Sequence, residues 1–220
     1  HFQLHWSEKW SEKWTSNIAL HYTLGKGYFE QYREDETLAD YNLPDFNGNF
    51  TSDLVRKRWL DNDFFGTTFS LNYRTPKTDI LFGGAVNRYL GKHFGEVVWT
   101  QFYTPNTNKY YDNIGNKDDV NFYVKASQTF GKINFFADLQ YRMVFYQANS
   151  VKFSDVNDTF RFFNPKAGLN YQFNNKNSFY GYFGIANKEP RRDDYENGSI
   201  NPERLFDYEL GWKYNTSNVK

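Results

Sequence analysis

The sequence predicts an all-β fold, an antiparallel up-and-down transmembrane β-barrel, and three observations carry this prediction. Apolar and polar residues alternate along most of the chain, which is the pattern of strands with two different faces. The apolar faces contain almost no charged residues. Short and long connections alternate along the chain, as in barrels with tight turns at one end and long loops at the other.

The composition fits strands with many rings on a surface. Aromatic residues make up 21% of the 220 residues, while the mean hydropathy is −0.83. Chains of such polarity are often disordered, but disordered chains are poor in aromatic residues. The 26 basic and 26 acidic residues give a net charge of zero, which argues against a nucleic-acid-binding protein. There is no cysteine for disulfides or thiolate sites, and no apolar run of about 18 residues that would predict a transmembrane helix.

Nine segments with this alternation follow one another along the chain. In the sixth, Ile133, Phe135 and Leu139 oppose Asn134 and Asp138. The only charged residue on the apolar faces is at a segment end, Arg88, and a charge at the bilayer midplane would cost about 2–4 kcal/mol. The predicted strands are residues 2–6, 14–24, 65–73, 79–89, 120–126, 133–145, 163–173, 179–185 and 206–214.

We expect the apolar residues of these segments to share the convex, lipid-facing side of one sheet, because residues two apart in a strand point the same way. The residues that define this face are Phe65, Phe69, Leu71, Phe135, Leu139, Met143, Leu169, Leu210 and Trp212. Pro165 interrupts the pattern. Because proline cannot donate to a ladder, it should lie at a strand start, an edge or a bulge, and we expect it near the start of its strand.

The connections predict the topology. Tight turns rich in Gly, Asn, Pro and Lys are expected at residues 75–78, 131–132, 174–177 and 215–218. Long polar loops are expected at residues 33–62, 91–119, 150–159 and 187–204. In an up-and-down meander, the short and long connections segregate to opposite ends. Because single-chain bacterial barrels normally have an even number of strands and open edges are untenable in lipid, nine strands indicate part of a larger barrel.

Four stretches resemble one protein family. Residues 52–63 (SDLVRKRWLDND) resemble an extracellular-loop segment of TonB-dependent outer-membrane receptors of the Bacteroidetes type. Residues 163–169 (FNPKAGL), 186–195 (ANKEPRRDDY) and 205–212 (LFDYELGW) are similar to strand and loop signatures of the same barrels, in the same order.

The resemblance implies a 22-stranded barrel around an N-terminal plug, which imports a scarce nutrient with energy delivered by TonB. Residues 1–220 would then be a partial barrel without the plug domain, in the outer membrane of a bacterial cell. The expected partners are outer-membrane lipid, TonB through the missing plug, and an extracellular siderophore, cobalamin, haem or glycan. We expect no enzyme activity and no cofactor.

Searches for catalytic or metal-binding motifs give no candidate. His1 and His5 share a strand face but lie roughly 13 Å apart at about 3.3 Å per residue, too far to share a metal ion. Adjacent carboxylates, such as Asp118 and Asp119, point to opposite faces of a strand and do not form an acid/base pair.

The residues predicted to contact a ligand lie in two of the polar segments. Trp99, Tyr103, Tyr110 and Tyr111 offer rings beside amide and hydroxyl groups, which suits glycans or ring-bearing ligands. The same rings would also suit packing between loops or a position at the membrane interface. Arg191 and Arg192 offer fixed positive charge for an anionic ligand.

Two alternatives belong to other classes of protein. A soluble all-β carbohydrate-binding module would use the apolar faces as the core between two sheets. A glycoside hydrolase fragment is disfavoured, because no suitably placed carboxylate pair is found. The position of the apolar face distinguishes the carbohydrate-binding module from the barrel. In the module this face is buried between two sheets, and in the barrel it is exposed to lipid.

Overall fold

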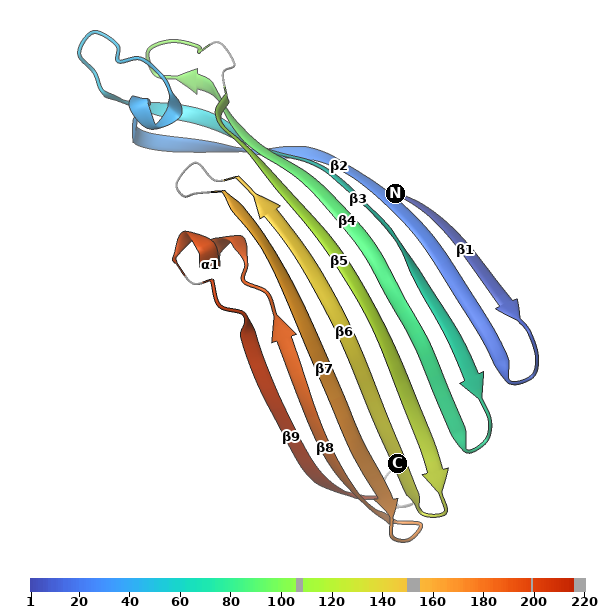
Figure 1. Ribbon diagram of the computed structural model, residues 1–220. Helices are drawn as coiled ribbons and strands as arrows, with labels where there is room; N and C mark the ends of the chain where they lie inside the picture. Colours follow the sequence, from blue (N-terminus) through green and yellow to red (C-terminus); the bar gives the residue numbers. More distant parts are fainter. Residues whose placement is uncertain (106–108, 150–154, 199, 216–220) are drawn as a thin grey trace.

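The chain forms one antiparallel sheet in which each strand pairs with the next in the sequence (Figure 1). The computed structural model describes residues 1–105, 109–149, 155–198 and 200–215. The strands are β1 (Phe2–Lys9), β2 (Trp14–Thr37), β3 (Thr51–Arg74), β4 (Thr78–Thr100), β5 (Lys109–Phe130), β6 (Ile133–Ala148), β7 (Val156–Gln172), β8 (Asn177–Lys188) and β9 (Glu203–Tyr214). A short 3-10 helix, η1 (Leu38–Tyr41), and a five-residue helix, α1 (Arg192–Glu196), lie in the connections.

The nine predicted strands are confirmed in number and order, but the first half of the chain has longer strands than predicted. β2 and β3 each have 24 residues, so most of residues 33–62, predicted as a loop, is strand. Most of residues 91–119 is likewise strand, in β4 and β5. The segment at residues 52–63, expected as a loop, lies in β3. Both faces of these extensions are mixed in polarity, so the alternation that revealed the other strands is absent.

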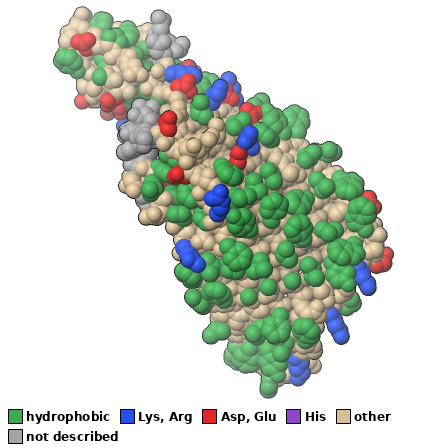
Figure 2. Space-filling view, viewed as in Figure 1, with side chains coloured by type: hydrophobic (Ala, Val, Ile, Leu, Met, Phe, Trp, Pro, Cys, Tyr) green, Lys and Arg blue, Asp and Glu red, His purple; other side chains and the backbone are tan. Residues whose placement is uncertain are grey.

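The predicted apolar face is confirmed by the register of the strands. Cross-strand partners share a face, and partners such as Leu71 and Phe82, or Phe135 and Leu169, lie across from each other throughout the sheet. All nine residues that defined this face at the sequence level fall on it. Figure 2 shows hydrophobic side chains gathered over this face, with few charged ones among them. We call this side the apolar face and the opposite side the polar face.

The apolar face is exposed and does not form a core. Leu210 is 91% exposed and Trp212 is 62% exposed. The described residues form a single sheet, so the sandwich expected for a soluble carbohydrate-binding module is wrong. Within the described part of the chain, no helix is long and apolar enough to cross a membrane.

The two ends of the sheet differ as predicted (Figure 1). The turns at residues 75–78, 131–132 and 174–177 lie at one end, the turn end. The connections that contain η1 and α1 lie at the opposite end, the loop end. In the predicted turn at residues 215–218, residues 216–218 lie outside the described residues. Among the described residues, neither β1 nor β9 pairs on its outer side, so the sheet is not closed.

The apolar face gives way to charge partway along the strands. Arg88 of β4 and Asp118 of β5 face each other there and form an ion pair. We call the part of the apolar face between this row and the turn end the apolar band. A strand of 24 residues is roughly 75–80 Å long at about 3.3 Å per residue. A barrel strand needs about 9–11 residues to cross a bilayer, so β2 and β3 continue far beyond the band.

The expectation that Pro165 begins its strand is wrong. β7 starts at Val156, and Pro165 lies opposite Leu139 in the middle of the strand. The ladder between β7 and β8 ends beside it, at Lys166, so this part of β7 is an edge on the β8 side. There the Asn164 side chain accepts a 3.0 Å hydrogen bond from the Asn187 backbone, in place of ladder pairing.

Glycines let large rings lie across neighbouring strands on the polar face. Phe136 of β6 and Tyr182 of β8 stack with their centroids 6.0 Å apart. Gly168 of β7 lies between them, paired with both. A Cβ atom at Gly168 would lie 2.3 Å from the Phe136 ring and 2.8 Å from the Gly181 carbonyl oxygen.

Replacing Gly168 with valine should therefore destabilise the sheet by about 1–3 kcal/mol, the usual cost of overpacking. The measurement is the free energy of unfolding of the complete receptor in detergent, followed by tryptophan fluorescence. Gly115→Ala is the control, because a Cβ atom at Gly115 would meet nothing within 4 Å. Equal stability of the two variants would contradict the close packing around Gly168.

Candidate functional site

The connections at the loop end fold back on the polar face and bury a small apolar cluster. Leu38 and Tyr41 of η1 are buried. Tyr41 packs with Leu54 of β3 and Val97 of β4, and all three are at most 3% exposed. Tyr110 of β5 packs against this cluster. Four segments far apart in the sequence therefore meet here and fix the side chains around them.

A row of tyrosines extends from this cluster. The Tyr110 ring centroid lies 4.7 Å from that of Tyr41 and 4.9 Å from that of Tyr111. Burial, with the hydrogen bond that Tyr41 donates to Glu36, raises the pKa of Tyr41 to about 12, and burial also raises the pKa of Tyr110. Both phenols are protonated at neutral pH. The Tyr110 hydroxyl is buried, and by distance and angle it forms no hydrogen bond to the described residues.

Two arginines of β3 lie beside these rings. Arg56 donates a 2.8 Å hydrogen bond to the Tyr41 hydroxyl and a 2.9 Å hydrogen bond to the Gln31 side chain. Arg58, two residues along the same face, donates 3.4 Å to the Tyr111 hydroxyl. In the part of the chain that the structure describes, neither guanidinium forms an ion pair with a carboxylate. Their positive charge is therefore available to an anionic ligand.

A histidine and a third arginine complete the site. His93 of β4 lies on the polar face beyond the apolar band, and its Nε2 atom is 3.5 Å from the Tyr89 hydroxyl. Burial lowers the pKa of His93, and the positive charges of Arg192 and Arg58 lower it further. Arg192 of α1 and Arg58 of β3 thus act on the same imidazole, although they come from opposite parts of the chain.

A buried carboxylate holds the connection that carries Arg192. Glu189 follows β8, is 8% exposed, and accepts 2.8 Å and 3.1 Å hydrogen bonds from Arg142. It also pairs with Lys117 of β5. Burial alone would raise the pKa of Glu189, but the hydrogen bonds from Arg142 and Lys117 outweigh it and hold the pKa at about 2. The connection therefore folds inward over the polar face, across β7 and β6 to β5.

A second anchor lies on the other side of Arg192. The Tyr195 hydroxyl donates 2.6 Å to the Asp158 carboxylate of β7, and its ring lies 5.7 Å from that of Tyr146 on β6. Burial and the hydrogen bond to Asp158 raise the pKa of Tyr195. Arg192 therefore lies between two points, Glu189 and Tyr195, at which the connection is bonded to the sheet.

The residues predicted from the sequence divide into two groups. Tyr110, Tyr111 and Arg192 belong to this site. Arg191 caps α1 instead, where its backbone N–H donates 2.7 Å to Asp194 and its side chain is 67% exposed.

The other two predicted residues lie apart from the site. Tyr103 packs between two connections, with its ring 6.0 Å from Phe46 and its hydroxyl donating 3.4 Å to the Pro44 carbonyl. Tyr103 therefore has the other role considered for these rings, which is packing between loops. Trp99 pairs with Val55 and lies on the other side of the sheet from Arg56.

The sequence analysis missed Tyr41, Arg56, Arg58 and His93. Arg56 and Arg58 are two residues apart, which puts them on one face of a strand. That signal was present, but residues 33–62 were interpreted as a loop, where a period of two has no meaning. His93 lies in residues 91–119, which were also interpreted as a loop.

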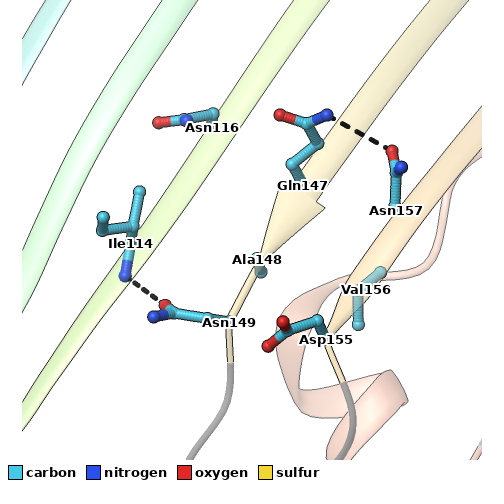
Figure 3. Close-up of a pocket in the computed structure, with 8 residues that line it drawn as sticks. All are labelled: Ile114, Asn116, Gln147, Ala148, Asn149, Asp155, Val156 and Asn157. Carbon is cyan, nitrogen blue, oxygen red and sulfur yellow. Dashed lines mark hydrogen bonds between the residues drawn. The ribbon is translucent and has the colours of Figure 1, made fainter.

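A separate pocket of about 340 Å³ lies beyond the apolar band between β5, β6 and β7 (Figure 3). Asn116, Gln147 and Asn157 lie side by side on adjacent strands there, and Gln147 donates 3.4 Å to Asn157. These three side chains share the side of the sheet that carries the apolar face, so a ligand held by them would be outside the barrel.

The site on the polar face can bind an anion. Arg56, Arg58 and Arg192 supply positive charge, and the tyrosine hydroxyls supply hydrogen bonds and ring surfaces. In residues 1–105, 109–149, 155–198 and 200–215, no three His, Asp or Glu side chains come close enough to hold a metal ion by themselves.

Comparison with known proteins identifies relatives of the whole chain. The sequence model of a family described as "TonB dependent receptor-like, beta-barrel" matches residues 1–219. No curated protein matches the chain.

Solved structures share its fold. The ferric citrate transporter FecA in its unliganded form matches with a TM-score of 0.70 at 11% identity, over 98% of this chain and 32% of FecA. The copper transporter OprC matches with a TM-score of 0.70 at 11% identity, over 98% of this chain and 36% of OprC. The siderophore receptor PiuA from Acinetobacter baumannii matches with a TM-score of 0.65 at 13% identity, over 97% and 37%. The chain spans about a third of the length of these structures.

The anchor at Glu189 generates a prediction. Glu189→Gln should loosen residues 189–195 by about 1–3 kcal/mol, because it removes the carboxylate that accepts hydrogen bonds from Arg142 and Lys117, and only Arg142 keeps another carboxylate partner, Asp119. Hydrogen exchange of this connection in the complete receptor is the measurement. The lowered pKa means that the anchor is fully formed above the ordinary glutamate pKa of 4.5 and is lost only as the pH falls towards about 2.

Exchange protection in the unmodified protein, corrected for intrinsic rates, should accordingly be the same at pH 5 and pH 7. Glu203→Gln is the matched control, since its 61% exposed side chain pairs with Lys188 at the surface. Protection that is unchanged by Glu189→Gln would show that the anchor does not hold the connection.

Proposed function

The chain belongs to the TonB-dependent receptor β-barrel family, and on this premise we propose that it forms part of the barrel wall of a nutrient-import receptor in a bacterial outer membrane. The family consists of outer-membrane transport receptors of Gram-negative bacteria, and the chain is not an enzyme. A complete receptor would contain further strands and a plug domain through which TonB acts.

The apolar face supports the membrane part of the proposal. It runs across all nine strands in one register and its side chains are exposed. Contact with lipid stabilises such a face, because an exposed apolar surface of this extent is unfavourable in water. The polar face then lines the barrel interior, and the loop end faces the outside of the cell.

The ligand proposed for the receptor is an anionic metal chelate of the siderophore type. The observation that carries this proposal is the position of Arg56 and Arg58 beside the rings of Tyr41, Tyr110 and Tyr111 on the polar face at the loop end. The charge of Arg192 also reaches this side of the sheet, since it lowers the pKa of His93. Negatively charged oxygen atoms of a chelate can pair with guanidinium groups, while its rings can lie against tyrosines. The ferric citrate transporter FecA and the siderophore receptor PiuA have the same fold.

Uptake by cells tests the proposal. The complete receptor is expressed in cells that lack their own receptors, and uptake of ferric citrate, a ferric catecholate, cobalamin, haem and a maltooligosaccharide is compared. We expect uptake of an iron chelate only, and its loss when TonB is deleted. If only cobalamin, haem or the sugar were taken up, the proposed ligand class, an iron chelate of the siderophore type, would be wrong. Uptake in cells without TonB would contradict TonB-dependent import.

A charge on the apolar face should destabilise the receptor if that face meets lipid. Leu139 lies in the middle of the apolar band and is 48% exposed, so Leu139→Arg should cost about 2–4 kcal/mol. The measurement is the free energy of unfolding in lipid vesicles. Thr68→Arg, exposed on the polar face, is the control and should cost less than about 1 kcal/mol. Similar losses in both variants would argue against a lipid-facing surface.

Removing positive charge from the site should weaken ligand binding. Arg58→Gln combined with Arg192→Gln should lower the affinity of the complete receptor for the imported iron chelate by about tenfold or more, since each lost charged hydrogen bond costs about 1.5–3 kcal/mol. Calorimetry measures the affinity. Arg74→Gln is the control, because Arg74 is at the turn end and pairs with Asp79. Unchanged affinity in the double variant would remove these arginines from the binding site.

A further inference from the structure

On β2 to β9, the charged residues of the apolar side lie at its border towards the loop end or beyond it, and at the border of β4 and β5 they are paired. The Arg88 guanidinium donates 2.6 Å hydrogen bonds to both carboxylate oxygens of Asp118. On β3, Asp63 accepts a hydrogen bond from Tyr22. The protein itself supplies the partners of the charges in this part of the border.

Two arginines farther along the same border have no such partner. Arg161 of β7 lies opposite Met143 and is exposed. Arg204 of β9 lies opposite Asn187, is also exposed, and has its guanidinium 4.7 Å from the centre of the Phe206 ring. Across the described residues, neither arginine has a carboxylate within ion-pair distance. This part of the border therefore has two uncompensated positive charges.

The two arginines are near neighbours on the surface. The Asn187 side chain donates 3.2 Å to the Phe163 carbonyl, which places the Arg204 row beside Phe163. Phe163 is two residues from Arg161 on the same face. With strands about 4.8 Å apart and about 3.3 Å per residue, the two Cα atoms are roughly 12 Å apart. Two extended arginine side chains can therefore reach one group between them.

The surroundings indicate what this group is. Phe163 and Phe206, respectively 55% and 49% exposed, lie next to the arginines on the apolar face. A molecule bound by both features must combine negative charge with long apolar chains. The planar guanidinium with its fork of N–H donors matches the oxygen atoms of a phosphate group.

We propose that Arg161 and Arg204 form a site on the outer wall of the barrel for the phosphate groups of a lipid headgroup in the outer leaflet. The acyl chains of this lipid lie along Phe163, Phe206 and the apolar band. The site is separate from the ligand site on the polar face and does not depend on which nutrient is imported. It fixes the height of β7 and β9 in the membrane.

Native mass spectrometry of the complete receptor in detergent tests this site. The protein is titrated with lipid A, which has two phosphates, with dephosphorylated lipid A, and with inorganic phosphate. Arg161→Gln combined with Arg204→Gln should lower the affinity for lipid A by about tenfold or more. Arg88→Gln with Asp118→Asn, which removes a matched pair from the same border, should leave the affinity unchanged.

Dephosphorylated lipid A and inorganic phosphate should each bind at least about tenfold more weakly than lipid A. Equal affinity of the arginine variant and the unmodified receptor for lipid A would overturn the proposal. An affinity for inorganic phosphate equal to that for lipid A would also overturn the proposal, because the site would then recognise a free anion. If the glutamine variant fails to migrate as a folded barrel in gels, Arg161→Lys with Arg204→Lys replaces it. Loss of the bidentate geometry in that variant should still lower the affinity for lipid A.

Discussion

Hydrogen bonding between neighbouring backbones is the interaction on which the rest of this structure depends. Every strand pairs with the next one in the sequence, so the polar backbone groups of the wall are satisfied by adjacent strands. The same pairing puts successive side chains on opposite faces. One face can therefore be apolar across all nine strands, while the other carries Arg142, Asp119 and the tyrosines. Neither face could exist without the continuous register between strands.

Beyond the apolar band, the same strands serve a different purpose. β2 to β5 continue towards the loop end, where neither face needs to be apolar. Cross-strand pairs of rings and charges replace the apolar surface there, as where Trp59 stacks on Phe94 with their centroids 5.7 Å apart. The extensions give Arg58 and His93 rigid positions on strands. Residues on strands are held more accurately than residues on loops.

Two kinds of positive charge are separated by the sheet. Arg58 and Arg192 lie on the polar face, where the anchor at Glu189 keeps Arg192 near His93. Arg161 and Arg204 lie at the border of the apolar face, next to exposed rings. The same guanidinium chemistry thus suits a ligand inside the barrel and a lipid outside it. The face on which an arginine lies is decided by whether its position in the strand is odd or even.

The sequence by itself determined the strand order, the apolar face and the turns, because a period of two is a local property that any stretch of strand displays. It also contained Tyr110, Tyr111 and Arg192. Only the tertiary structure decided the length of β2 to β5, since polar extensions show no alternation, and the position of Pro165, since an edge in mid-strand depends on where β8 ends. It alone put Arg192 close enough to His93 to lower the pKa of the imidazole, because the position of the connection depends on a buried ion pair between Glu189 and residues of β5 and β6. Contacts between distant segments leave no periodic trace in the sequence.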